Sequence, residues 1–230
     1  MMPVANRAQF PNAIDTLTGS TKKRRSAQGT EPTILADIYQ EEVNIAIWRR
    51  QLSISLQNSI NEFMTSRKVV QMSTSVTPTS ALSNIREYLG NNAPCELSEN
   101  IAELVDMFCC LFDLSRTGLR LTALDSAMCP RFHVDRVPGR LVTTYQGVAT
   151  EWLPHQLVDR KKLGSGNEGK PDNQSGLFQK EADIRRLCCG DVAILKGEMW
   201  EGNENAGLVH RSPALRAGRS RLLLTLDFGG

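Results

Sequence analysis

The sequence predicts an α+β protein in which a mostly helical first half supports a second half built from short β-strands. Apolar residues recur at helical spacing in the first half, for example at Ile101, Leu104, Val105 and Phe108. After residue 118 the pattern changes to short strand-like segments that are separated by Gly, Pro and Asn. Helices followed by many strands indicate a β-sandwich or barrel that is backed by helices.

Length and composition indicate one domain. The chain has 230 residues, of which 40% are hydrophobic and 23% are charged, and these values exclude wholesale disorder. The net charge of +2 argues against a nucleic-acid partner. No apolar run approaches the ~20 residues that a membrane helix needs, and Met1–Ser20 lacks the apolar core of a secretory signal. We therefore expect a cytoplasmic protein with no membrane partner, whose six cysteines are free thiols.

The elements follow in a simple order. Residues 1–32 are predicted as a flexible tail, because they are rich in polar residues, Gly and Pro around a basic run. Residues 33–230 form the domain, with helical support over 33–118 and a β core over 119–230. Helices are expected around residues 52–64, over 82–89 with Gly90 as the stop, and from Ser98 to Gly118. Strands are expected at Leu119–Leu124, Arg131–Val137, Arg140–Tyr145, Asp191–Leu195, Leu208–Arg211 and Arg221–Phe228. The polar, Gly-rich residues 159–183 are predicted as a loop inserted between two strands.

Two of the three histidines suggest a metal site. His133 and Asp135 form a His-x-Asp pair, and side chains two apart on a strand point to the same face. His210 follows in the last third of the chain and is a candidate third ligand if the two strands face each other. Two histidines and one carboxylate on one face of an ion form the facial triad of non-haem Fe(II) oxygenases. His155, at the mouth of the predicted loop, is expected to be a surface residue.

The last predicted strand supplies a candidate anion-binding group. An oxygenase of this kind needs a cation for the far carboxylate of 2-oxoglutarate, and a guanidinium matches a carboxylate best. Arg219 and Arg221 share one face of this strand with Leu223 and Thr225, so their parity does not choose between them. Parity also does not say which face of the strand looks into the barrel.

These residues also carry a family resemblance. The stretches MCPRFHVDRVPGRLVTTYQGVATEWL and GDVAILKGEMWEGNENAGLVHRSP resemble the bacterial family called domain of unknown function 1826. The His-x-Asp pair, the distal His and the Arg are more distantly similar to the prolyl-hydroxylase branch of 2-oxoglutarate oxygenases. That resemblance implies a double-stranded β-helix (a jelly-roll or cupin-like fold) with supporting helices. It implies iron ligands at His133, Asp135 and His210, a co-substrate clamp at Arg221 or Arg219, and Tyr145 as a further residue holding the co-substrate.

Three hypotheses follow. The first is an Fe(II)- and 2-oxoglutarate-dependent oxygenase whose substrate, a small molecule or a protein side chain, the sequence does not identify. The second is a non-catalytic protein that binds zinc through the same three residues and is linked to metal homeostasis, since imidazole suits zinc as well as iron. The third is a structural β-sandwich without metal. A cation buried near the three ligands distinguishes the first hypothesis from the second.

Overall fold

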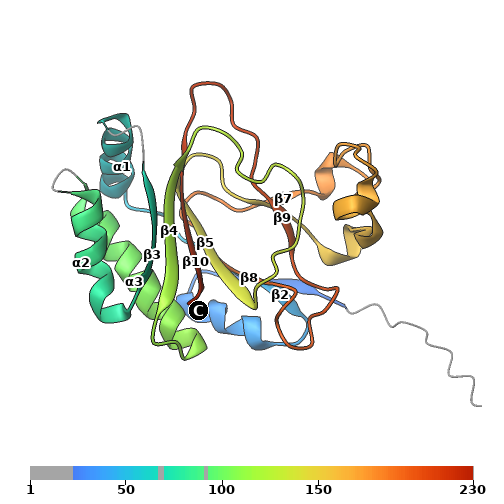
Figure 1. Cartoon of the computed structure of the whole chain (residues 1–230), viewed down its shortest axis with the longest axis horizontal. Helices are drawn as coiled ribbons and strands as arrows, with labels where there is room; N and C mark the ends of the chain where they lie inside the picture. Colours follow the sequence, from blue (N-terminus) through green and yellow to red (C-terminus); the bar gives the residue numbers. More distant parts are fainter. Residues whose placement is uncertain (1–22, 67–69, 91–92, 230) are drawn as a thin grey trace, which may run out of the picture.

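The chain folds around two β-sheets. The computed structural model describes residues 23–66, 70–90 and 93–229 (Figure 1). The strands are β1 (Arg25–Gly29), β2 (Val43–Trp48), β3 (Gln71–Val76), β4 (Thr117–Leu124), β5 (Gly139–Gln146), β6 (Glu151–Leu153), β7 (Arg185–Arg186), β8 (Val192–Lys196), β9 (Val209–Arg211) and β10 (Arg221–Phe228). Seven strands form a large sheet in the order β1-β2-β8-β5-β10-β4-β3, and three form a small sheet in the order β7-β6-β9. All pairs are antiparallel except β1 with β2.

The path of the chain between the sheets confirms the double-stranded β-helix. The chain passes from β4 in the large sheet to His133, which bridges to His210 at the edge of the small sheet. It then returns to β5, crosses to β6 and β7, and continues through β8, β9 and β10 in alternate sheets. This alternation is that of a jelly roll, whose interior lies between the two sheets. Strands β1, β2 and β3 extend the edges of the large sheet.

Three helices cover the outer face of the large sheet (Figure 1). They are α1 (Ile54–Ser66), α2 (Pro78–Leu89) and α3 (Cys95–Phe112). Because side chains alternate along a strand, one face of β10 presents Leu222, Leu224 and Leu226 to the helical core, and the other presents Leu223 and Thr225 to the interior. The outer face of the sheet and the apolar stripe of α3 therefore share one core, in which each fully buried leucine contributes about 1.5–3 kcal/mol.

The inserted segment between β6 and β7 contains no strand, as predicted for residues 159–183. It forms short 3-10 turns at η2 (His155–Leu157), η3 (Arg160–Lys162), η4 (Gly164–Asn167) and η5 (Glu181–Asp183). Two of its apolar side chains, Leu177 and Phe178, are buried in a small cluster with Phe132, and the rings of Phe132 and Phe178 lie 5.8 Å apart. The segment is therefore packed against the strand that carries His133.

The prediction of a tail was wrong for its last part. Within the predicted tail, Arg25–Gly29 form β1, and η1 (Pro32–Tyr39) begins before its end. Residues 1–22 lie outside the described residues. The tail prediction failed here because β1 is polar and takes its hydrogen bonds from a parallel partner, β2, which is remote in sequence. The strand β2 itself lies in the region predicted to be mostly helical.

Two further boundaries differ from the prediction. Helix α3 begins at Cys95 after Pro94, so Ser98 is a buried residue inside the helix and not its N-cap. The helix ends at Phe112, where Asp113 takes a left-handed conformation with φ 51°, and Gly118 lies in β4. The predicted strand at Arg131–Val137 is reduced to the single bridge of His133 with His210. Within the described residues, no helix has the length and apolar character needed to cross a membrane.

Candidate metal centre

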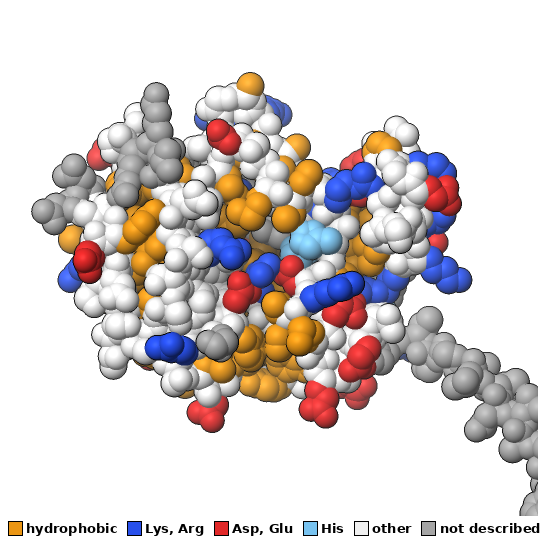
Figure 2. All heavy atoms as spheres, in the orientation of Figure 1, with side chains coloured by type: hydrophobic (Ala, Val, Ile, Leu, Met, Phe, Trp, Pro, Cys, Tyr) orange, Lys and Arg blue, Asp and Glu red, His pale blue; other side chains and the backbone are white. Residues whose placement is uncertain are grey.

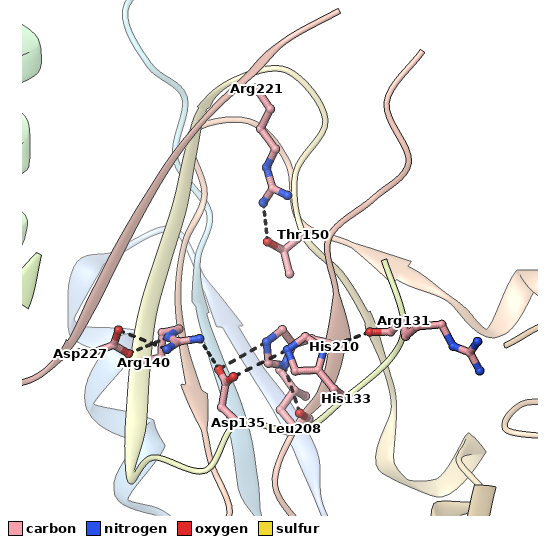
Figure 3. Close-up of polar contacts among 9 residues, drawn as sticks. All are labelled: Arg131, His133, Asp135, Arg140, Thr150, Leu208, His210, Arg221 and Asp227. Atoms are coloured by element: carbon pink, nitrogen blue, oxygen red, sulfur yellow. Dashed lines mark hydrogen bonds and ion pairs between the residues drawn. The ribbon is translucent and has the colours of Figure 1, made fainter. Parts of the chain in front are cut away.

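The three predicted ligands converge at the open end of the interior (Figure 3). One potential ligand atom from each of His133, Asp135 and His210 lies within 4.8 Å of the other two. Nε2 of His210 lies 3.4 Å from Oδ2 of Asp135, and Nε2 of His133 lies 3.7 Å from Oδ1. The bridge between the two histidine backbones places their rings together, with centroids 4.6 Å apart. This arrangement argues against the hypothesis of a purely structural sandwich, in which these side chains need not meet.

Backbone contacts orient both imidazoles. Nδ1 of His133 lies 2.9 Å from the carbonyl oxygen of Arg131, and Nδ1 of His210 lies 3.2 Å from that of Leu208. A carbonyl oxygen only accepts a hydrogen bond, so each Nδ1 carries the proton and donates it. The lone pair of each neutral ring is therefore on Nε2, which faces Asp135. Hydrogen bonds of this kind fix the tautomer of metal-binding histidines.

His210 is the most enclosed of the three residues. Its side chain is 9% exposed, compared with 34% for His133 and 13% for Asp135. Burial lowers the pKa of His210 from 6.5 to about 4, although the charge of Asp135 opposes this shift. The ring is thus neutral near pH 7, which is the form that binds a metal ion. Two imidazoles and one carboxylate form a donor set that suits iron or zinc.

An ion-pair network holds Asp135 in place. Nη1 of Arg140, on β5, donates to Oδ2 of Asp135 at 2.8 Å. The same guanidinium also donates to Asp227 of β10, from Nε to Oδ1 at 2.6 Å and from Nη2 to Oδ2 at 3.1 Å. Burial acts to lower the pKa of Arg140, but its hydrogen bond to Asp227 and the charges of Asp135 and Asp227 raise it above its ordinary value. Arg140 therefore remains charged and acts as the positioning residue for Asp135.

We expect Arg140→Gln to weaken metal binding without abolishing it. Residues that orient a ligand typically contribute about 10- to 100-fold to metal affinity. Competition with a chromophoric chelator under anaerobic conditions measures this affinity. Arg120→Gln is the matched control, because Arg120 lines the same cavity and makes no ion pair with the described residues. Equal affinities for the two variants would show that Arg140 does not position Asp135.

The inserted segment also supports the centre through one buried carboxylate. Asp172 accepts a hydrogen bond from the backbone N–H of Phe132 at 2.9 Å and pairs with Nε of Arg131 at 3.1 Å. It also lies 3.3 Å from Nη1 of Arg211, the neighbour of His210. Asp172 thus links the segment that precedes His133 to strand β9, which carries His210. The sequence offered no signal for this contact, because it depends on how the insertion packs.

A cavity opens beside the two histidines and leads to Arg221. Figure 2 shows histidine at the edge of a hollow that also exposes basic and acidic side chains. Alternate residues of β4, β5 and β10 line the cavity together with residues after His210. These lining residues are Arg120, Thr122, Arg140, Val142, Thr150, Arg211, Ser212, Arg221, Leu223 and Thr225, with Met128 and Cys129 at the loop before His133. The interior face of the large sheet is therefore far more polar here than its outer face.

Arg221 is a buried cation without a carboxylate partner. Its residue is 1% exposed, and no described Asp or Glu pairs with it. Nη2 donates to Oγ1 of Thr150 at 2.8 Å and of Thr144 at 3.3 Å, Nη1 contacts Oγ of Ser212 at 3.4 Å, and Nε has no partner among the described residues. Burial alone lowers its pKa to about 10, which leaves it charged near neutral pH. A buried unpaired charge is costly, so this geometry indicates a site for an anion.

The structure excludes two other predicted co-substrate residues from the cavity. Arg219 precedes β10, is exposed, and lines a different groove beside Met64 and Gln71. Tyr145 points to the helical side of the large sheet, where its hydroxyl donates to Oδ1 of Asn100 at 2.8 Å. Burial raises the pKa of the Tyr145 phenol. Tyr145 lies three residues after Val142 on β5, so the two side chains point to opposite faces of the sheet, and it is Val142 that faces the cavity.

Sequence reasoning missed the hydroxyl groups that hold Arg221 and the exposed Arg120 at the mouth of the cavity. Thr144 lies on β5, and Thr150 follows β5 in the chain. The sequence signal for a polar face is the alternation of polar and apolar residues along β4 and β10. The structure assigns Arg140 to Asp135 and Arg131 to Asp172.

These features define a double-stranded β-helix protein with a candidate His-Asp-His metal centre and a buried arginine beside it. The chain belongs to the family described as protein of unknown function (DUF1826), whose model matches residues 29–227. This match confirms the resemblance found in the sequence. The search of the curated proteins found no match.

Solved structures provide a distant comparison. The chain is similar to the rice dioxygenase for auxin oxidation, with a TM-score of 0.48 and 11% identity over 90% of this chain and 83% of that one. It is also similar to the Arabidopsis thaliana dioxygenase for auxin oxidation 1 in its 2-oxoglutarate complex. The TM-score is 0.47 and the identity is 11%, over 90% of this chain and 92% of that one. A Pseudomonas putida prolyl-4-hydroxylase gives a TM-score of 0.40 and 11% identity over 85% of this chain and 96% of that one. Likeness at this level does not define the chemistry of this chain, which depends on its own residues.

Proposed function

We propose that this protein is an Fe(II)- and 2-oxoglutarate-dependent oxygenase. The observation that carries the proposal is the pairing of two sites in one cavity. One is a set of two oriented neutral imidazoles and a carboxylate, and the other is the buried, unpaired guanidinium of Arg221. A metal ion would bind to the three residues of the first site, and the far carboxylate of a 2-oxo acid would balance the charge of Arg221 at the second.

The donor set fits the metal that this function requires. His133, Asp135 and His210 would hold Fe(II), because two imidazoles and one carboxylate are the ligand set of non-haem Fe(II) oxygenases. When bound, Fe(II) supplies the chemistry that couples oxidative decarboxylation of 2-oxoglutarate to succinate with oxidation of a substrate C–H bond. Every other task belongs to the chain itself: the Nδ1 contacts orient the imidazoles, and Arg140 positions Asp135.

Arg221 would bind the distal carboxylate of the co-substrate. Its planar guanidinium matches a carboxylate bidentately. The hydroxyl groups of Thr144 and Thr150 contact its Nη2, and that of Ser212 contacts its Nη1. The primary substrate, a small molecule or a protein side chain, would enter past Met128 and Arg120.

The alternative is a non-catalytic zinc-binding protein that uses the same three ligands. Ligand type alone suits both metals. A metal carrier gains nothing from a second cation that is buried in the same cavity, and the cost of burying Arg221 without a carboxylate argues for the oxygenase. The two functions therefore differ in what they require of Arg221.

Release of succinate tests the proposed function. We expect protein supplied with Fe(II), 2-oxoglutarate and air to form succinate, detected by mass spectrometry, even without the primary substrate. His133→Ala should form none above a protein-free control, and His155→Gln should match the unmodified protein, because His155 lies outside the centre. Identical succinate release from His133→Ala and the unmodified protein would overturn the proposal.

A further inference from the structure

A second polar cavity lies at the opposite edge of the β-helix, between β1, β2, β6 and β7. It has a volume of about 420 Å³ and shares no lining residue with the cavity of the metal centre. Five arginines line it, namely Arg24, Arg25, Arg49, Arg185 and Arg186, together with Ser26, Gln28, Asn44, Trp152, Pro154, His155 and Gln156. Among the described residues, no Asp or Glu forms part of its wall. A cavity with this lining favours an anion.

Three of the five guanidiniums pair with carboxylates that do not line the cavity. Arg25 pairs with Glu42 at 3.2 Å, Arg49 pairs with Asp191, and Arg186 pairs with Glu151. The other two, Arg24 and Arg185, contact no carboxylate within the described part of the chain. Nη1 of Arg185 donates only to the carbonyl oxygen of Ala182, at 3.0 Å. Two of the arginines in the lining therefore have no carboxylate partner among the described residues.

Arg24 is the more informative of these two residues because it is buried. Its residue is 3% exposed, and its Nε donates to Oδ1 of Asn203 at 2.8 Å. Its two other contacts are the carbonyl oxygens of Lys23, at 2.9 Å, and Gly202, at 3.2 Å. Neutral acceptors hold the guanidinium in place but do not balance its charge. A charge that is buried without a counterion costs free energy that a bound anion would recover.

Trp152 places in the wall of this cavity a buried donor that has no hydrogen-bond partner within the described part of the chain. It lies on β6, is 5% exposed, and forms part of the cavity wall. Its indole Nε1–H is buried and has no acceptor among the described residues. Buried polar groups in folded proteins nearly always have a partner. This N–H is out of reach of water in the cavity, so an oxygen-rich ligand becomes its acceptor only if the wall around Trp152 shifts.

We propose that this cavity binds an organic dianion, either a phosphate monoester or a dicarboxylate. Two uncompensated guanidiniums match a dianion, and a phosphate monoester carries about −1.5 to −2 charges near neutral pH. Arginine pairs with phosphate and carboxylate groups through the same bidentate geometry. The site is separate from the metal centre and does not depend on the function proposed for that centre.

Calorimetric titration of the full chain tests this site with three probes. Adenosine 5′-monophosphate represents the phosphate monoesters, succinate represents the dicarboxylates, and adenosine is the neutral control. We expect one of the two dianions to bind saturably and adenosine not to bind. Binding by adenosine 5′-monophosphate assigns the site to phosphate monoesters, and binding by succinate assigns it to dicarboxylates.

Variants locate the bound anion. Arg185→Gln and Arg24→Gln should each weaken binding at least 10-fold, and the exposed Arg185 keeps the test valid if the Arg24 variant does not fold. Arg86→Gln, in an exposed pair with Glu99 on the helical side, should bind like the unmodified protein. Arg221→Gln should also bind normally, which separates this site from the co-substrate site. The proposal is overturned if neither dianion binds, or if Arg185→Gln binds as the unmodified protein does.

Discussion

Arg221→Gln should weaken 2-oxoglutarate binding to the metal-loaded protein by about 100-fold or more, and Arg219→Gln should leave it unchanged. Loss of a charged hydrogen-bond partner in a buried site costs about 2–5 kcal/mol, and about 1.4 kcal/mol corresponds to a factor of ten. Arg221 is buried beside the metal centre, whereas Arg219 is exposed in another groove. Calorimetry on protein loaded with Mn(II), which does not turn over, measures the difference.

The stability of the Arg221 variant is the control for this result. Arg221 has no carboxylate partner, so glutamine removes an uncompensated buried charge and breaks no ion pair among the described residues. We expect the thermal midpoint of the metal-free Arg221→Gln protein to stay the same or rise. Weaker binding that comes with a large loss of stability would indicate misfolding. Equal 2-oxoglutarate affinities for both variants would show that Arg221 does not hold the co-substrate.

Asp135→Asn should lower Fe(II) affinity by at least about 100-fold. The substitution keeps the shape of the side chain but removes the negative charge, which both the metal and Arg140 require. Anaerobic competition with a chromophoric chelator gives the affinity, and metal analysis after desalting gives the bound fraction. His155→Gln is the matched control, because it changes the one histidine that lies outside the centre.

Retention of one Fe(II) per chain by Asp135→Asn would contradict this assignment. The variant also loses the partner of Arg140, so its stability should be compared with that of Asp227→Asn. The carboxylate of Asp227 binds the same guanidinium from the other side. If Asp227→Asn loses as much stability but keeps the metal, the loss in Asp135→Asn is a loss of ligation and not of folding.

The convergence of His133, Asp135 and His210 was predictable from the sequence, although their local structure was not. The His-x-Asp pair was assigned to a strand, where alternate side chains share a face, but only His133 forms a bridge there. The two residues still converge, because His133 pairs with His210 and Arg140 draws Asp135 toward the large sheet. The chemistry of the residue types was therefore a better guide than the backbone periodicity.

The choice between Arg219 and Arg221 depended on information that the pattern does not contain. Both have the same parity, and only the start of β10 at Arg221 distinguishes them. The resemblance implied a co-substrate role for Tyr145, but its side chain lies in the helical core, because the helices of the first half cover that side of β5. Strand β1 was missed because a polar edge strand is stabilised by a partner remote in sequence. Each of these errors concerns tertiary contacts.

Anaerobic titration of the metal-free protein with Fe(II) and then 2-oxoglutarate tests the central claim most directly. Chelation of Fe(II) by a 2-oxo acid gives a visible charge-transfer band that iron binding alone does not give. The structure predicts a saturable band that is lost in His133→Ala and shifted to higher 2-oxoglutarate concentrations in Arg221→Gln. The absence of any band, together with tight binding of Zn(II) to His133, Asp135 and His210, would contradict the oxygenase and leave a zinc-binding protein.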